Sequence, residues 1–177
     1  MLLKYPETRF EEIYEIYEEA FPPVERRKKE DQKAVLKNPC YYVRIKEDEG
    51  KIVAFLGYWV LSGCMFLEHL ATSAVCRGKG YGKQLVEECV QEARNLGKMV
   101  FLEIEPITEA DPMTGRRAGF YERLGFKVNT FPYEQMPLKP EDEPCRLWVM
   151  SLGQTIEEQA FLPYKKEIYR EVYGVEM

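Results

Sequence analysis

The segment whose residue types and spacing best suit chemistry is a glycine-rich run at residues 77–82, which reads Arg-Gly-Lys-Gly-Tyr-Gly. It follows an apolar run that ends near Thr72 and leads into a helical pattern from Lys83. Glycine has no Cβ, so backbone amides can approach a ligand closely, and the first amides of a helix have no intrahelical partner. The helix dipole and the basic side chains favour an anion there. We therefore predict a cradle for a diphosphate; the alternative is an ordinary glycine-rich turn with solvated basic residues.

The composition argues against several other kinds of partner. With 177 residues, a net charge of −5 and a pI of about 5.2, the chain suits one acidic domain and not a nucleic-acid-binding protein. No apolar run reaches the roughly 20 residues that span a bilayer, so we expect no membrane association. Lys4, Pro6 and Glu7 interrupt the N-terminus before a signal peptide could form, which indicates a cytoplasmic location.

The cysteine and histidine content bears on metals and redox state. Five cysteines, an odd number at irregular spacing, favour free thiols in a reducing cytoplasm. The chain has no CxxC pair, and His69 is its only histidine. A structural zinc site needs several such ligands, so we expect no metal.

Apolar periodicity predicts the elements that must position the cradle. Strand patterns occupy residues 41–46, 52–61, 65–72, 99–105, 126–133 and 145–152, and helical patterns occupy residues 8–21, 24–37, 83–96 and 116–124. We also expect a helical tail that breaks at Pro163. The basic run at residues 26–29 is interpreted as a solvated helix face.

The strands before and after the cradle helix define the topology. The strand at 65–72, the helix and the strand at 99–105 form a βαβ unit, so the two strands should lie parallel. The cradle then lies at the carboxyl edge of the sheet, where open α/β folds bind ligands. We therefore predict a single α/β domain over residues 1–177, with a C-terminal helical extension at about 154–177.

Two motifs make the chain resemble the GNAT superfamily of acyl-CoA-dependent N-acetyltransferases. Residues 77–82 match the main signature, which is Gln or Arg, two variable residues, Gly, a variable residue, and Gly or Ala. Tyr121 precedes the pair Gly125-Phe126, as in the second signature. The resemblance covers roughly residues 5–152, with the motifs at about 65–126. It implies a mixed sheet of six to seven strands with splayed central strands and helices on both faces.

The resemblance also implies acetyl-CoA as cosubstrate. In the family the pantetheine arm pairs with the splayed end of the strand before the cradle, and the diphosphate lies on the glycine loop. The implied cofactor contacts are Leu70, Ala71, Thr72, Arg77, Gly78, Lys79, Gly80, Tyr81, Gly82 and Lys83.

The implied reaction is the attack of an amine on a thioester, and it needs a base. An ammonium with a pKa of about 10.4 is rarely neutral at pH 7, and an ordinary glutamate near 4.3 is about six units too weak to take its proton. The pKa of the glutamate must be raised, or the proton must pass through water. The candidates are Glu68 and Glu103, the latter alternating with Glu105 on one strand face. The alternative is structural pairing with Arg116 or Arg117.

The resemblance assigns the other roles as well. Tyr121 would protonate the departing thiolate; the alternative is that it only packs beside Phe120 and Phe126. The main-chain amide of Leu70 is our candidate to polarise the thioester carbonyl. His69 is interpreted as a packed strand residue that faces away from its neighbour Glu68 unless a bulge breaks the alternation.

We predict an N-acetyltransferase that acts by direct attack in a ternary complex on a small-molecule amine or a protein amino group. The family often has an asparagine and an alanine where this chain has Thr114 and Arg117. The family's asparagine touches the cofactor, so this departure gives weight to the alternative, a non-catalytic CoA sensor or protein-interaction domain with the same fold. A third interpretation treats the aromatic C-terminal helix as a surface for a homodimer or another partner.

Overall fold

The computed structural model describes residues 1–177 and is built around a six-stranded sheet of order β1-β2-β3-β4-β8-β5. Its strands are β1 (Tyr41–Asp48), β2 (Lys51–Val60), β3 (Cys64–Thr72), β4 (Met99–Ile104), β5 (Phe126–Asn129) and β8 (Trp148–Leu152). A separate pair joins β6 (Glu134–Gln135) to β7 (Cys145–Arg146) in antiparallel fashion. Only β3 and β4 run parallel, as the βαβ pattern predicts.

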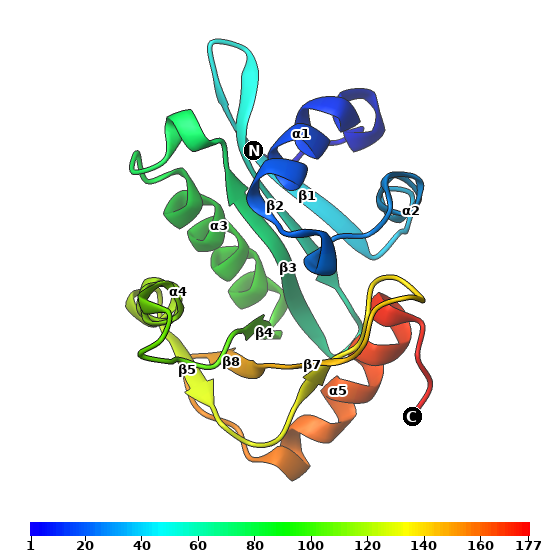
Figure 1. Cartoon of the computed structure of the whole chain (residues 1–177), viewed down its shortest axis with the longest axis vertical. Helices are drawn as coiled ribbons and strands as arrows, with labels where there is room; N and C mark the ends of the chain where they lie inside the picture. The colour runs from blue at the N-terminus through cyan, green and yellow to red at the C-terminus, as the bar shows by residue number, and fades with distance from the viewer.

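Helices cover both faces of this sheet, which confirms the predicted fold class. They are α1 (Phe10–Ala20), α2 (Lys29–Val35), α3 (Tyr81–Leu96), α4 (Pro112–Arg123) and α5 (Glu158–Tyr173), with 3₁₀ turns η1 (Pro6–Arg9), η2 (Pro23–Glu25) and η3 (Ala74–Cys76). Figure 1 shows α3 on one side of β1, β2 and β3, and α1 and α2 on the other.

Each face of the sheet has its own hydrophobic cluster. Phe55, Trp59 and Phe101 point toward α1 and α5, while the alternate residues Leu56 and Val100 point toward α3. This alternation follows from the two-residue period of a strand. Each large apolar side chain buried in this way stabilises the fold by roughly 1.5–3 kcal/mol.

The parallel pair β3 and β4 separates after a short contact. Residues 64–67 of β3 pair with residues 99–102 of β4, and the last pair joins Leu67 to Leu102. Beyond this point β3 continues to Thr72 and pairs only with β2. The edge of β3 that faces β4 is therefore open over residues 68–72, as the expected splay of the central strands requires.

The region predicted as one helix over residues 24–37 is different. It forms the 3₁₀ turn η2, then extended backbone, and α2 begins only at Lys29. The cause is Arg27, which turns inward and is only 6% exposed. The interpretation of residues 26–29 as a solvated face is therefore wrong for Arg27.

Two other boundaries differ from the expected ones. Helix α5 runs through Pro163 without a break, because the carbonyl that proline leaves unpaired belongs to Gln159 in the exposed first turn, where water can reach it. Phe161 and Ile168 pack this helix against the core on either side of the proline. The strand predicted at 145–152 is split at Leu147 into β7 and β8, which join different sheets.

Candidate functional site

A groove of about 450 Å³ lies where β3 ends and α3 begins. The end of β3, the turn η3, the glycine loop with the start of α3, and one residue of α4 line this groove. The lining residues are Leu70, Ala71, Thr72, Cys76, Arg77, Gly78, Gly80, Tyr81, Gly82, Lys83 and, from α4, Phe120. Every residue predicted for the cofactor except Lys79 lies on this wall. Cys76 and Phe120 were missed, because each is an apolar residue that the sequence alone would assign to the core.

The glycine loop has free backbone donors. The amides of residues 77–83 donate no hydrogen bond within the chain, and the first that does is Gln84, to the Gly80 carbonyl at 3.1 Å. Gly78 and Gly80 have φ angles of 80° and 81°, a region that other residues rarely adopt. A Cβ on either glycine would meet nothing within 4 Å, so the loop is open to solvent.

The open edge of β3 adds further main-chain groups to the groove. Ser73 donates its amide to the Val53 carbonyl of β2 at 2.8 Å. Because successive backbone groups along a strand point in opposite directions, Ala71 also turns to β2, while Leu70 and Thr72 face the splay. An extended ligand could pair with these two residues.

The charges at the groove suit an anion. Arg77 and Lys79 are exposed, and Lys83 has only a distant contact with Glu87, at 3.9 Å. Arg77 Nε also donates to the Thr72 carbonyl at 3.4 Å. Free amides at a helix N-terminus together with cationic side chains fit a diphosphate-bearing ligand such as acetyl-CoA.

Glu68 lies at a β-bulge and is fully engaged. The β2–β3 register shifts here, since Gly57 pairs with His69 and Tyr58 with Leu67. Glu68 accepts from Arg27 Nη2 at 2.6 Å and from Trp59 Nε1 at 2.9 Å. Although burial raises the pKa of Glu68, the guanidinium of Arg27 and then His69 hold that pKa below its ordinary value.

His69 lies on the same side of the sheet as Glu68, because the bulge breaks the alternation of side chains. Its ring packs edge-on against Tyr17 and Phe21, with centroids 4.9 and 4.8 Å away. Its Nε2 lies 3.1 Å from the carbonyl oxygen of Glu25. The expectation that His69 is a packed strand residue is confirmed, but it does not face away from Glu68.

Glu103 is the first residue of β4 beyond the last pair with β3. Its Oε1 accepts from the phenols of Tyr173, at 2.6 Å, and Tyr133, at 3.0 Å. Its Oε2 is buried and has no hydrogen-bond partner. Burial raises the pKa of Glu103 to about 7, even though the two phenols lower it.

Two further carboxylates, Glu25 and Glu105, and the thiol of Cys145 lie within the electrostatic surroundings of Glu103. Burial raises the pKa of Glu25, and the charge of Glu105 raises it further. Partial burial also raises the pKa of the Cys145 thiol, as do the charges of Glu25, Glu105 and Glu103, so these three carboxylates lie within electrostatic range of Cys145. Of the two arginines expected to pair with carboxylates, Arg117 pairs with Glu105.

Tyr121 lies on α4, next in sequence to Phe120, which lines the groove. Its ring packs edge-on against Phe120 and Phe126, with centroids 5.0 and 5.8 Å away. Burial raises the pKa of its phenol to about 12, opposed by the charge of Arg117. The packing that the sequence offers as one interpretation is therefore observed, and the phenol oxygen makes no hydrogen bond within the chain.

Thr114, one of the two departures from the family pattern, is buried and serves the loop before α4. Its hydroxyl donates to the Asp111 carbonyl at 2.7 Å and accepts from the Thr108 amide at 3.0 Å. The Asp111 carboxylate in turn accepts from the Met113 amide at 3.0 Å and caps the helix. Thr114 thus organises the loop and does not point its hydroxyl at a ligand.

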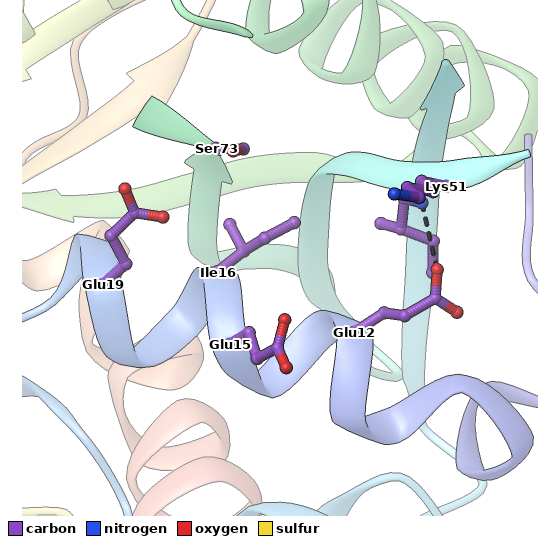
Figure 2. Close-up of a pocket in the computed structure, with 7 residues that line it drawn as sticks. Glu12, Glu15, Ile16, Glu19, Lys51 and Ser73 are labelled. Carbon is purple, nitrogen blue, oxygen red and sulfur yellow. Dashed lines mark hydrogen bonds between the residues drawn. The ribbon is translucent and has the colours of Figure 1, made fainter. Parts of the chain in front are cut away.

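A second hollow, of about 350 Å³, lies between α1 and the strand ends (Figure 2). Figure 2 shows Glu12, Glu15 and Glu19 projecting from α1 on one side of it, with Ser73 and Lys51 on the other. Glu12 accepts from the Ile52 amide at 3.2 Å, and Glu19 accepts from the Ala74 amide at 3.3 Å. These contacts tie α1 to β2 through Glu12 and to the start of η3, which leads into the glycine loop, through Glu19, so we assign these two carboxylates a structural role.

Metals and membranes receive no support from the structure. No group of three or more His, Cys, Asp or Glu side chains is placed to hold a metal ion, and all five cysteines are free. None of the helices combines the length and the apolar character needed to cross a bilayer.

Comparison with known proteins places these features in context. A model of the Acetyltransferase (GNAT) family matches residues 10–126. The chain is 28% identical over 165 residues to "Putative acetyltransferase YjbC" of Bacillus subtilis, covering 90% of this chain and 80% of that protein.

Solved structures agree with this match. A Bacteroides thetaiotaomicron protein named "Putative acetyltransferase from GNAT family" has a TM-score of 0.81 at 28% identity, covering 96% of this chain and 94% of its own. The structure of yncA from Salmonella typhimurium, solved with its cofactor acetyl-CoA, has a TM-score of 0.62 at 19% identity, covering 89% of this chain and 95% of its own.

Proposed function

Because the chain belongs to the Acetyltransferase (GNAT) family, we propose that it transfers an acetyl group from acetyl-CoA to a primary amine by direct attack in a ternary complex. The observation that carries this proposal is the set of amides at residues 77–83 that donate no hydrogen bond within the chain, placed beside the open edge of β3. Amides in such a position satisfy a diphosphate without any particular side chain.

Specific residues would hold each part of acetyl-CoA, which supplies the thioester when bound. The amides of residues 78–83 would hold the diphosphate, with Arg77, Lys79 and Lys83 adding charge. The main-chain groups of Leu70 and Thr72 would pair with the pantetheine arm. The amide of Leu70 is also the donor that we assign to the thioester carbonyl.

We assign the base to Glu103 and not to Glu68. Both lie where β3 and β4 separate, but the arginine and tryptophan contacts of Glu68 stabilise its ionised form and make it a poor proton acceptor. Glu103 has a free oxygen and a pKa raised to about 7 by burial. The pKa of an ammonium, about 10.4, then lies about 3.5 units above the pKa of Glu103. For an ordinary glutamate the difference would be about six units.

Tyr121 is the acid that we assign to the departing thiolate. With a pKa of about 12 its phenol stays protonated at neutral pH. Transfer of the phenol proton to a thiolate, whose conjugate thiol has a pKa of about 8.5, is uphill by about 5 kcal/mol. This is more than the same transfer from an unperturbed phenol would require. The same burial would also raise the pKa of the thiol, which narrows this difference.

The carboxylates around the proposed base support a cationic acceptor. Glu25, Glu105 and the proposed base Glu103 all lie within electrostatic range of the Cys145 thiol, and of the three only Glu105 is paired with an arginine, Arg117. Carboxylates of one sign in a partly buried site raise the local concentration of a cation. We therefore propose a small cationic amine or a protein amino group as the acceptor.

The test combines a binding measurement with an activity screen. Calorimetry should show that acetyl-CoA binds, and release of free CoA should accelerate with at least one amine from a panel of polyamines, amino acids, aminoglycosides and peptides with free N-termini. Cationic amines should be favoured over neutral amines of similar size. Tight binding without CoA release on any amine would instead identify a CoA sensor, and absence of binding would refute the proposal.

A further inference from the structure

The carboxylate of Glu103 is held by residues that lie beyond the part of the chain that the family model matches. Tyr133 and Tyr173 both donate to Oε1, and both follow residue 126, where the family match ends. The amide of Gln135 donates to the Tyr173 phenol at 3.4 Å. One carboxylate oxygen is thus bonded twice, while Oε2 is buried and has no partner.

Helix α5, which carries Tyr173, is fixed at both ends. Near its start Phe161 packs against Phe101 with ring centroids 5.1 Å apart. Near its end Arg27 Nη2 donates to the Val172 carbonyl at 3.4 Å, next to Tyr173. The last turn of α5 therefore contacts Glu103 directly and, through Arg27, reaches Glu68 as well.

We propose that Tyr173 and Tyr133 are positioning residues, which hold one oxygen of Glu103 so that the other keeps no partner in the chain and is left to accept the proton of the acceptor amine. The proposal rests on the assignment of Glu103 as the base. In the step concerned, Oε2 takes a proton from the amine nitrogen as that nitrogen forms its bond to the acetyl carbon, and the thiolate leaves with the electron pair of the broken C–S bond.

The chemistry of the two donors explains why phenols suit this position. A phenol stabilises a carboxylate by one hydrogen bond and adds no positive charge, whereas a guanidinium, as at Glu68, holds the carboxylate ionised. The pKa values of both phenols are raised well above the ordinary value by burial and then by the charge of Glu103, so both remain donors.

All groups that face Glu103 enter its titration. Tyr169 on α5 and Cys145 on β7 lie within electrostatic range of Glu103. Burial and, from β3, the charge of Glu68 raise the pKa of Glu103, while the phenols of Tyr173 and Tyr133 and the Gln135 amide lower it. Removing one phenol should therefore raise this pKa further, by about one pH unit. If the substitution merely let water in, the pKa would instead fall toward its ordinary value.

The experiment follows the carboxyl carbon of Glu103 by NMR. Protein labelled with ¹³C at glutamate side chains is titrated, and the Glu103 signal is assigned by its absence in Glu103→Gln. The midpoint should rise in Tyr173→Phe and in Tyr133→Phe. The matched control is Tyr164→Phe, on the same helix, which packs on Phe101 and makes no hydrogen bond to Glu103, so the midpoint should not move.

The outcomes separate this inference from the proposed function. An unchanged or lowered midpoint in both folded variants would overturn the positioning role, whichever group is the base. With an amine found active in the screen, the pH at which the rate rises should shift upward together with the NMR midpoint. If the NMR midpoint shifts and the pH dependence of the rate does not, Glu103 is not the base, and Oε2 does not take the proton of the amine.

Discussion

Glu68 and Glu103 lie directly beyond the last paired residues of β3 and β4, Leu67 and Leu102, on the two sides of the point where the strands separate. Glu68 is neutralised by Arg27, while Glu103 meets only phenols and an amide. The ionised Glu68 raises the pKa of Glu103, so the two carboxylates are coupled although they do not bond. The ion pair with Arg27 keeps Glu68 ionised, while Glu103, which has no cationic partner, keeps a pKa of about 7.

The first prediction concerns Glu103→Gln. A base must be ionised to act, so the rate of the wild-type protein should rise with pH through about 7, the pKa of Glu103. In Glu103→Gln this rise should disappear, and the rate at pH 8 should fall by roughly 10²- to 10⁴-fold. The measurement is kcat/KM for CoA release across the pH range, with an amine from the screen.

The control for that prediction is Glu105→Gln. Glu105 lies two residues further along the chain and pairs with the exposed Arg117, so the rise near pH 7 should remain in this variant. A Glu103→Gln protein that keeps the wild-type pH profile would show that another group, or a water molecule, takes the proton.

The second prediction concerns the stability that Glu68 provides. Glu68→Gln leaves Arg27 buried without a counterion, which should lower the free energy of unfolding at pH 7 by about 3–5 kcal/mol. The pKa of Glu68 is lower in the folded than in the unfolded chain, so its contribution is present above the unfolded value of about 4.3 and is lost as the pH falls further. The difference between the two proteins should therefore narrow below about pH 4.

Urea denaturation at pH 7 and below pH 4 measures this difference. The control is Glu11→Gln, because Glu11 and Lys29 form an exposed ion pair whose loss should leave the stability unchanged. A difference between wild type and Glu68→Gln that does not vary with pH would argue against an ionised Glu68 in the folded protein.

The parts of the fold and site that depend on local sequence could be predicted. The glycine loop is defined by spacing within six residues, and the parallel pair β3–β4 follows from one strand-helix-strand pattern. The error at residues 24–28 arises because the inward turn of Arg27 is a tertiary contact that overrides propensity. The break expected at Pro163 does not occur because the proline lies near the start of α5, where the freed carbonyl is exposed.

The chemistry of the two carboxylates could not be derived from the sequence, because their partners are distant in the chain. Arg27 lies 41 residues before Glu68, and Tyr173 lies 70 residues after Glu103. No spacing rule connects such residues, so Arg27 was interpreted as solvated and neither tyrosine was identified. The sequence could indicate only that a bulge at Glu68 would break the alternation of side chains, and not that a bulge is present, because a register shift depends on both paired strands.

The third prediction concerns Gly82→Val. A Cβ at Gly82 would lie 3.7 Å from Leu70 Cδ2 and from Phe120 Cζ, an ordinary contact, so the fold should tolerate it. The branched side chain would occupy the groove, and the Kd for CoA should rise at least about tenfold. Calorimetry checks this, with Gly119→Val as control, since that Cβ meets only the flexible end of Arg123. Unchanged affinity in Gly82→Val would remove the groove as the CoA site.

The fourth prediction concerns Tyr121→Phe. Phenylalanine keeps the ring contacts to Phe120 and Phe126, so the folded structure and the affinity for acetyl-CoA should stay the same. If the phenol protonates the leaving thiolate, kcat should fall by roughly 10²-fold or more at neutral pH. Because the pKa of Tyr121 is about 12, the wild-type phenol stays protonated up to pH 10 and should cause no loss of rate there.

Steady-state kinetics with saturating acetyl-CoA separates the two roles of Tyr121. The control is Tyr42→Phe, which removes a phenol from a ring stacked on Tyr58, outside the groove, and should change neither kcat nor affinity. An unaltered kcat in Tyr121→Phe would leave this tyrosine with a packing role alone. The thiolate of a thiol with a pKa of about 8.5 would then leave without a proton and take one from the solvent after the C–S bond has broken.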